Sequence, residues 1–137
     1  MFWLTGITYG SYGQVVWTFS AVKKTGNIVE VHVKASLSEG WHLYSSDTVS
    51  SPFPTQVKVL AGPGLSLQGP LREEGRMVVG MQPEGGEPVR YFKGTVDFIQ
   101  SVTISADLHS VSGTVQFVIC TDEQCMPPGK KEFTVSW

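Results

Sequence analysis

The sequence predicts an all-β fold, and three observations support the prediction. Apolar residues make up 41% of the 137 residues and charged residues 16%, which is enough apolar material for a folded core. Apolar and polar residues alternate with period two, and no long segment carries the period of a helix. Gly- and Pro-rich clusters separate the alternating segments. Short strands at this spacing are typical of an antiparallel, immunoglobulin-like β-sandwich.

The strands can be placed in order along the chain. Residues 14–20 are rich in β-forming residues and open the series. Residues 27–35 alternate, with Val29, Val31 and Val33 on one face, and residues 24–27 are predicted to turn the first strand into the second. Five further strands are predicted, at residues 55–60, 76–79, 94–104, 114–120 and 131–135.

The apolar residues of these strands are expected to form one core. The residues expected in it are Trp17, Phe19, Val31, Val33, Phe98, Val102, Ile104, Val115 and Phe117. We expect one domain over residues 14–137, preceded by an extension or remnant at residues 1–13 that lacks the basic start of an intact secretory signal. No apolar stretch approaches the length of a membrane span.

The charge pattern argues against a nucleic-acid partner. The formal net charge is −2, and Lys23-Lys24 and Lys130-Lys131 are the only basic doublets. Phosphate binding needs a basic stripe or patch, which two surface doublets do not supply. Glu73, Glu74 and Glu84 are expected to be solvated.

The only two cysteines, Cys120 and Cys125, stand four residues apart and allow three interpretations. As a staple, the bridge closes so short a loop that it contributes about 2 kcal/mol, against about 4 for a bridge spanning sixty residues. As a zinc site, the pair lacks partners, because His32, His42 and His109 are scattered along the chain. We therefore expect neither a metal nor an organic cofactor.

As a working dithiol, the pair needs an exposed sulfur and a thiolate. Asp122 and Glu123 lie between the cysteines, and their negative charge disfavours a thiolate. Such a slow nucleophile suits a relay that reacts only with chosen partners. The spacing alone leaves the staple and the relay both open.

Methionines offer a further, weaker interpretation of the same region. Met77, Met81 and Met126, with Cys125, are soft ligands of the kind that copper- or haem-handling accessory proteins use. They lie on different predicted strands and loops and show no ligand spacing.

Several segments in order resemble the N-terminal domain of the thiol:disulfide interchange protein DsbD, in the form found in Bacteroidetes-like bacteria. The resemblance covers residues 14–137. The segments that carry it are EGWHLYS at residues 39–45, PFPT at 52–55, YFKG with VDF at 91–98, and VSGTVQF leading to CTDEQCMPP at 111–128.

The resemblance implies an immunoglobulin-like sandwich whose Cys120/Cys125 pair cycles between dithiol and disulfide. It implies a periplasmic relay, a protein-disulfide reductase domain, that is supplied by a membrane-embedded reductase domain. The relay would deliver electrons to thioredoxin-fold proteins such as disulfide isomerases and cytochrome-maturation thioredoxins. By position, Cys120 forms the mixed disulfide, so a Cys125→Ser variant is expected to trap it.

The resemblance also implies the surroundings of the sulfurs. His42 and Tyr44 line the site, together with Asp122 and Glu123. A cap loop is expected at residues 80–91, where Met81 or Tyr91 would take the place of the shielding aromatic of better-known members. We expect a monomer without a small-molecule substrate. The alternative is an immunoglobulin-like extracytoplasmic binding module with a structural hairpin disulfide.

Overall fold

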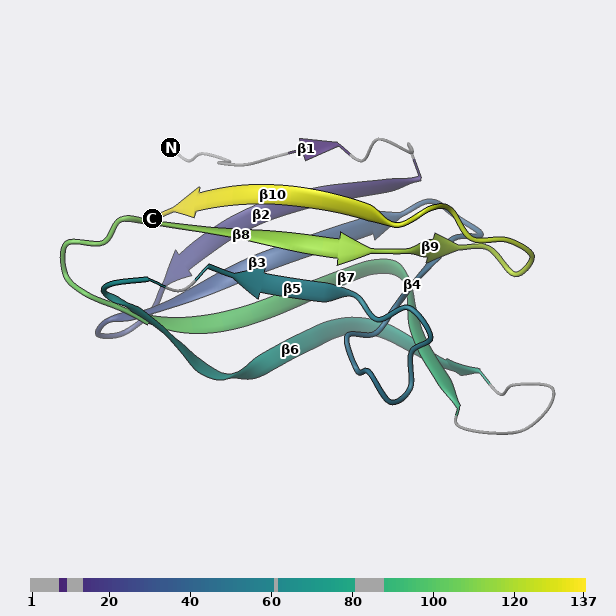
Figure 1. Ribbon diagram of the computed structural model, residues 1–137, viewed down its shortest axis with the longest axis horizontal. Coiled ribbons are helices and arrows are strands. Elements are labelled where there is room, and N and C mark those ends of the chain that lie inside the picture. Colours follow the sequence, from purple (N-terminus) through teal and green to yellow (C-terminus); the bar gives the residue numbers. More distant parts are fainter. Residues whose placement is uncertain (1–7, 10–13, 61, 81–87) are drawn as a thin grey trace.

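The computed structural model is an antiparallel β-sandwich, shown in Figure 1. It describes residues 8–9, 14–60, 62–80 and 88–137. A large sheet has the strand order β1-β2-β3-β7-β4-β9, with β6 also paired to β7, and a small sheet has the order β10-β8-β5. The strands are β1 (Thr8–Tyr9), β2 (Val15–Lys23), β3 (Ile28–Leu37), β4 (His42–Tyr44), β5 (Gln56–Val59), β6 (Leu65–Gly80), β7 (Val89–Ile104), β8 (Ser110–Phe117), β9 (Ile119–Cys120) and β10 (Gly129–Ser136).

The alternation in β2 and β3 produces the sandwich directly. Val29, Val31 and Val33 of β3 are fully buried, while the residues between them lie on the outer face. The turn between β2 and β3 contains Gly26 at φ 71°, a left-handed conformation that glycine adopts without steric cost. Every residue expected in the core is buried between the two sheets, so that prediction is confirmed. Among the described residues, no helix is long and apolar enough to cross a membrane.

Two predicted strands begin later than those of the structure, and a further strand was not predicted. β6 begins at Leu65 rather than residue 76, and β7 begins at Val89 rather than residue 94. Most of β6 is exposed, so it lacks the apolar alternation that marks a half-buried strand. β4 is only three residues long and gives no periodic signal.

The chain changes sheets just before the cysteines. β8 belongs to the small sheet, whereas β9, which starts two residues after β8 ends, pairs with β4 in the large sheet. Figure 1 shows β9 continuing the line of β8, with the following hairpin at the end of the molecule away from the C-terminus. The cysteine hairpin is thus held at one end of the sandwich.

An ionic cluster on the outer face of β3 and β7 gives a pH-dependent contribution to stability. His32 Nδ1 lies 2.8 Å from Asp97 Oδ2, and His32 Nε2 lies 3.3 Å from Glu30 Oε1. Glu30 also accepts a hydrogen bond of 3.0 Å from Arg72. The hydrogen bond to Asp97 is the main reason why the pKa of His32 is raised above 6.5, in spite of partial burial.

We expect His32→Gln to destabilise the domain more at pH 6 than at pH 8.5. A raised folded-state pKa stabilises the fold fully below the unfolded value of about 6.5, and this contribution disappears as the pH rises through the folded value. The expected loss at pH 6 is at most about 1 kcal/mol, because the cluster is partly exposed. Urea unfolding across this pH range measures it, with His109→Gln on an exposed histidine as the control. A pH-independent difference between His32→Gln and the wild type would contradict the assignment.

Candidate functional site: a disulfide hairpin at the sheet end

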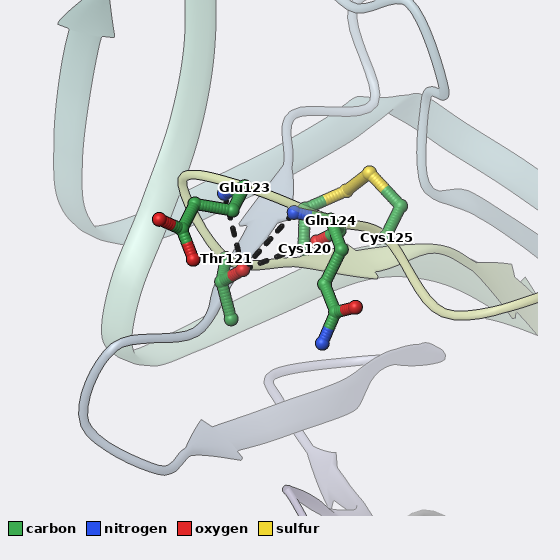
Figure 2. Close-up of a disulfide and its surroundings, with 5 residues drawn as sticks. All are labelled: Cys120, Thr121, Glu123, Gln124 and Cys125. Carbon is green, nitrogen blue, oxygen red and sulfur yellow. Dashed lines mark hydrogen bonds between the residues drawn. A yellow bond between two sulfur atoms is a disulfide. The ribbon is translucent and has the colours of Figure 1, made fainter.

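Cys120 and Cys125 form a disulfide across a tight hairpin, drawn in Figure 2. Their Cα atoms are 4.0 Å apart. The backbone of the hairpin has hydrogen bonds of its own. Thr121 N donates to Gln124 O at 2.7 Å, and Thr121 Oγ1 accepts from the backbone N–H groups of Glu123 and Gln124 at 3.2 and 3.1 Å. These bonds do not involve sulfur, so we expect the hairpin to persist when the disulfide is reduced.

The two cysteines differ in their exposure to solvent. Cys120 ends β9 and is 1% exposed, whereas Cys125 lies on the outer arm of the hairpin and is exposed. Cys125 is thus the more accessible of the two cysteines in the disulfide form, whereas sequence position assigns the contact with the partner to Cys120.

Strand register places His42 beside the buried cysteine. His42 of β4 lies directly opposite Cys120 of β9, and it also lies opposite Lys93 of β7. Directly opposite residues in antiparallel strands share a face, with Cβ atoms about 4.5–5.5 Å apart. The His42 ring contacts Tyr91 at a centroid distance of 4.3 Å and Tyr44 at 5.6 Å. The sheet thus places His42 beside Cys120 and groups the two other expected site residues, Tyr44 and Tyr91, around His42.

Burial tunes the ionisation of this aromatic group. Burial lowers the pKa of His42 below 6.5; the nearby Asp122 opposes the lowering and Lys93 adds to it. The imidazole is therefore mainly neutral at pH 7 and can accept a proton. Burial likewise raises the pKa of Tyr44 above 10, so its hydroxyl stays protonated.

The other expected site residues are placed as follows. Asp122 and Glu123 are exposed on the hairpin. Met81 and most of the expected cap loop, residues 81–87, lie outside the described residues. The ends of the expected loop are strand: Gly80 closes β6, and Val89 to Tyr91 open β7.

The methionines do not gather at the disulfide as a set. Met77 is 41% exposed on β6, whereas Met126 packs against the core. Within residues 8–9, 14–60, 62–80 and 88–137, no group of three or more His, Cys, Asp and Glu side chains is placed to hold a metal ion.

A carboxylate clamp near the site was not expected from the sequence. Glu73 accepts hydrogen bonds from Ser45 Oγ at 2.9 Å, from Ser46 N at 2.6 Å and from Ser46 Oγ at 2.7 Å. The expectation that Glu73 is merely solvated is therefore wrong. The clamp fixes the segment after β4 to β6, and Thr55 Oγ1 donates to Tyr44 O at 2.7 Å from the other end of that segment. Tyr44 is thus held in place by long-range contacts that no local pattern indicates.

Fold and site together define a β-sandwich domain with a disulfide at its surface and a partly buried aromatic group beside it. The family model described as "Thiol:disulfide interchange protein DsbD, N-terminal" matches residues 12–136, and the chain belongs to this family. Family membership and the bonded cysteine pair support thiol–disulfide exchange as the chemistry of the site. No curated protein sequence matches the chain.

Solved structures share the fold at low sequence identity. The N-terminal periplasmic domain of ScsB from Proteus mirabilis is 14% identical with a TM-score of 0.59, over 89% of this chain and 45% of that one. The chain therefore spans less than half of that ScsB domain. The reduced DsbD N-terminal domain of Neisseria meningitidis is 16% identical with a TM-score of 0.59, over 90% of this chain and 86% of that one. The GAE domain of GGA2p from Saccharomyces cerevisiae is 7% identical with a TM-score of 0.52, over 94% of each chain. The predicted immunoglobulin-like sandwich is confirmed.

Proposed function

We propose that residues 14–137 form a periplasmic electron-relay domain, preceded by an extension at residues 1–13. The relay passes two electrons through Cys120 and Cys125 from a membrane-embedded reductase domain to periplasmic thioredoxin-fold proteins. The observation that carries the proposal is a disulfide between an exposed and a buried cysteine in a chain of the DsbD N-terminal family. The periplasmic location of the similar ScsB domain supports the compartment.

The exposures of the two sulfurs set the order of the exchange steps. The Cys125 thiolate attacks the partner's disulfide, so that a bond forms from Cys125 to one partner sulfur and the other partner sulfur leaves as a thiolate. The Cys120 thiolate then attacks the Cys125 sulfur, which closes the Cys120–Cys125 disulfide and releases the second partner thiolate. Two electrons and two protons pass to the partner, and an upstream dithiol reduces the domain again. These roles reverse the sequence-based assignment, because Cys120 is buried.

His42 has a role in the second step. A buried thiol must lose its proton before it attacks, and the neutral imidazole directly opposite Cys120 is the acceptor that the sheet supplies. The imidazolium then returns the proton to the departing partner thiolate.

We expect His42→Phe to slow resolution of the mixed disulfide by about 10²-fold, the usual contribution of a general base, and to leave the first attack within about twofold. Phenylalanine keeps a ring against Tyr91. Rapid acid quenching followed by mass spectrometry measures both steps, because it counts the adduct and the products separately. His109→Gln, at an exposed histidine, is the control. Equal slowing of both steps would show that His42 only supports the structure.

Electron transfer to a thioredoxin-fold protein tests the proposed function itself. The reduced domain is mixed with an oxidised thioredoxin-fold protein, quenched with acid and alkylated. We expect two new thiols on the partner for each disulfide formed in the domain. If no such protein gains thiols from the domain, although dithiothreitol reduces it, the relay is excluded.

A further inference from the structure

A row of four residues crosses four adjacent strands and ends at the disulfide. Arg76 of β6 lies opposite Lys93 of β7, Lys93 lies opposite His42 of β4, and His42 lies opposite Cys120 of β9. Because directly opposite residues share a face, all four side chains lie on the same side of the large sheet. In the next row, Phe92, Leu43 and Ile119 are core residues, so the row with the cations is on the outer face.

The first two members of the row are exposed cations near the sulfurs. Adjacent strands are about 4.8 Å apart, so Lys93 and Arg76 start about 10 and 14 Å from the Cys120 backbone. Both are exposed, and neither forms an ion pair with a carboxylate among the described residues. Two neighbouring cations without an ion-pair partner in the described part of the chain can attract an anion from outside the domain.

These cations line a hollow of about 430 Å³. Trp41 provides an apolar wall of the hollow, and Glu39 is the one carboxylate among the described residues that line it. The remaining lining residues are Leu37, Ser38, Gly40 and Gly94. The hollow therefore has an excess of positive charge, with a guanidinium group that can bind a carboxylate through two parallel hydrogen bonds.

The cysteine hairpin itself carries the opposite charge. Asp122 and Glu123 are exposed between the two cysteines, and the charges of Asp122 and Lys93 shift the pKa of His42 in opposite directions. A protein that approaches the exposed Cys125 sulfur thus meets an acidic side and a cationic side. This asymmetry can orient a partner, and not only attract it.

We propose that Arg76 and Lys93, with the hollow beside them, bind an acidic side chain that a thioredoxin-fold partner carries about 10–14 Å from its reactive sulfurs. This inference rests on the proposed function, since it identifies the kind of disulfide on which the relay acts. The domain then selects disulfides with an acidic flank, because the bound carboxylate holds the partner's disulfide against Cys125. The contact raises the specificity and the rate of association with the partner, while the steps of thiol–disulfide exchange are unchanged.

Small disulfides of different charge test this selectivity without a partner protein. The reduced domain is reacted with glutathione disulfide, which is anionic, with neutral hydroxyethyl disulfide and with cationic cystamine. In each reaction the domain forms its disulfide and the probe is reduced to two thiols. The ionic strength is kept at about 0.02 M, where charges 10–14 Å apart still interact, and the series is repeated at about 1 M, where they are screened.

The double variant Arg76→Gln/Lys93→Gln is compared with Lys23→Gln/Lys58→Gln, which loses the same net charge at exposed positions on other strands. We expect the ratio of rate constants for glutathione disulfide over hydroxyethyl disulfide to fall three- to tenfold in the first variant, by analogy with steering by a few charges. In the same variant, the ratio of rate constants for cystamine over hydroxyethyl disulfide is expected to rise. The lysine control should keep the wild-type ratios, and the differences should disappear at high salt.

Equal changes in the two double variants would overturn the proposal, because they would show an effect of net charge alone. Unchanged ratios in both would overturn it as well. If the wild-type domain reduces none of the three small disulfides, the charge selectivity is overturned at this level, whereas the relay is judged separately by electron transfer to an oxidised thioredoxin-fold protein. The failure of the inference is thus distinguishable from the failure of the proposed function.

Discussion

The Cys120→Ser variant is expected to stay linked to its partner through Cys125, whereas Cys125→Ser is expected to lose exchange. Cys125 is exposed and attacks first, and the buried Cys120 is needed only to release the partner. Without Cys120 the mixed disulfide has no internal thiol to resolve it. Without Cys125 the remaining thiol is 1% exposed, and we expect it to react at least about tenfold more slowly.

Mass spectrometry of the adduct with an oxidised thioredoxin-fold protein measures this prediction. Each variant is mixed with the partner, alkylated, digested and searched for the linked peptide. The variant without either cysteine is the control for non-specific adducts. Equal adduct formation through Cys120 in Cys125→Ser would restore the roles assigned from sequence position, and would show that the hairpin opens to expose the buried sulfur.

Replacing Trp17 by alanine is expected to have the largest effect on stability, a loss of about 3–5 kcal/mol. Trp17 is fully buried where the two sheets meet, with its ring centroid 5.0 Å from that of Phe117 and 6.4 Å from that of Phe19. Alanine leaves a cavity between the sheets that rigid strands cannot close. Phe117 is the last residue of β8, which leads into β9. Losing the contact between Trp17 and Phe117 is therefore also expected to weaken the packing that holds the cysteine hairpin in place.

Urea unfolding followed by circular dichroism measures this loss, with Val22→Ala as the control at a side chain that is 44% exposed. The control should change the free energy of unfolding by less than about 0.5 kcal/mol. Trp17→Phe should cost less than Trp17→Ala, since it keeps a ring and removes an indole N–H that is buried without an acceptor among the described residues. A loss below about 1 kcal/mol in Trp17→Ala would mean that the sheets repack freely around this position.

The parts of the fold that could be predicted are those in which burial alternates within one strand. β2 and β3 each bury one face, so their apolar pattern shows both the strand and its orientation. The first half of β6 is an exposed strand with Gly69 and Pro70 at a shift in register, and a polar sequence of that kind is typical of a loop as well. Only its pairing with β7 makes it a strand.

In the site, too, the features that are local in sequence could be predicted, and those that depend on contacts between distant strands could not. The cysteine pair and its neighbours on the hairpin are visible in the sequence, and the family resemblance indicates His42 and Tyr44. The row from Arg76 to Cys120 is not visible, because it depends on the register of four strands. Arg76 lies opposite Lys93 only because the register between β6 and β7 shifts after Gly75. The shift lies near Gly94, which has φ 73°. At the same place the other neighbour of β7 changes from β3 to β4. The exposures of the two cysteines also follow from tertiary packing, so they could not be predicted from position along the chain, and the roles proposed for the two cysteines rest on them.

The reduction potential of the Cys120–Cys125 pair tests the central claim most directly. The domain is equilibrated in glutathione and dithiothreitol buffers of known potential, and the fraction of disulfide is measured after alkylation. A relay requires a potential of about −200 to −250 mV, in the range of known dithiol carriers. A potential well below about −300 mV, typical of structural disulfides in secreted proteins, would contradict the relay and favour a binding module with a hairpin staple.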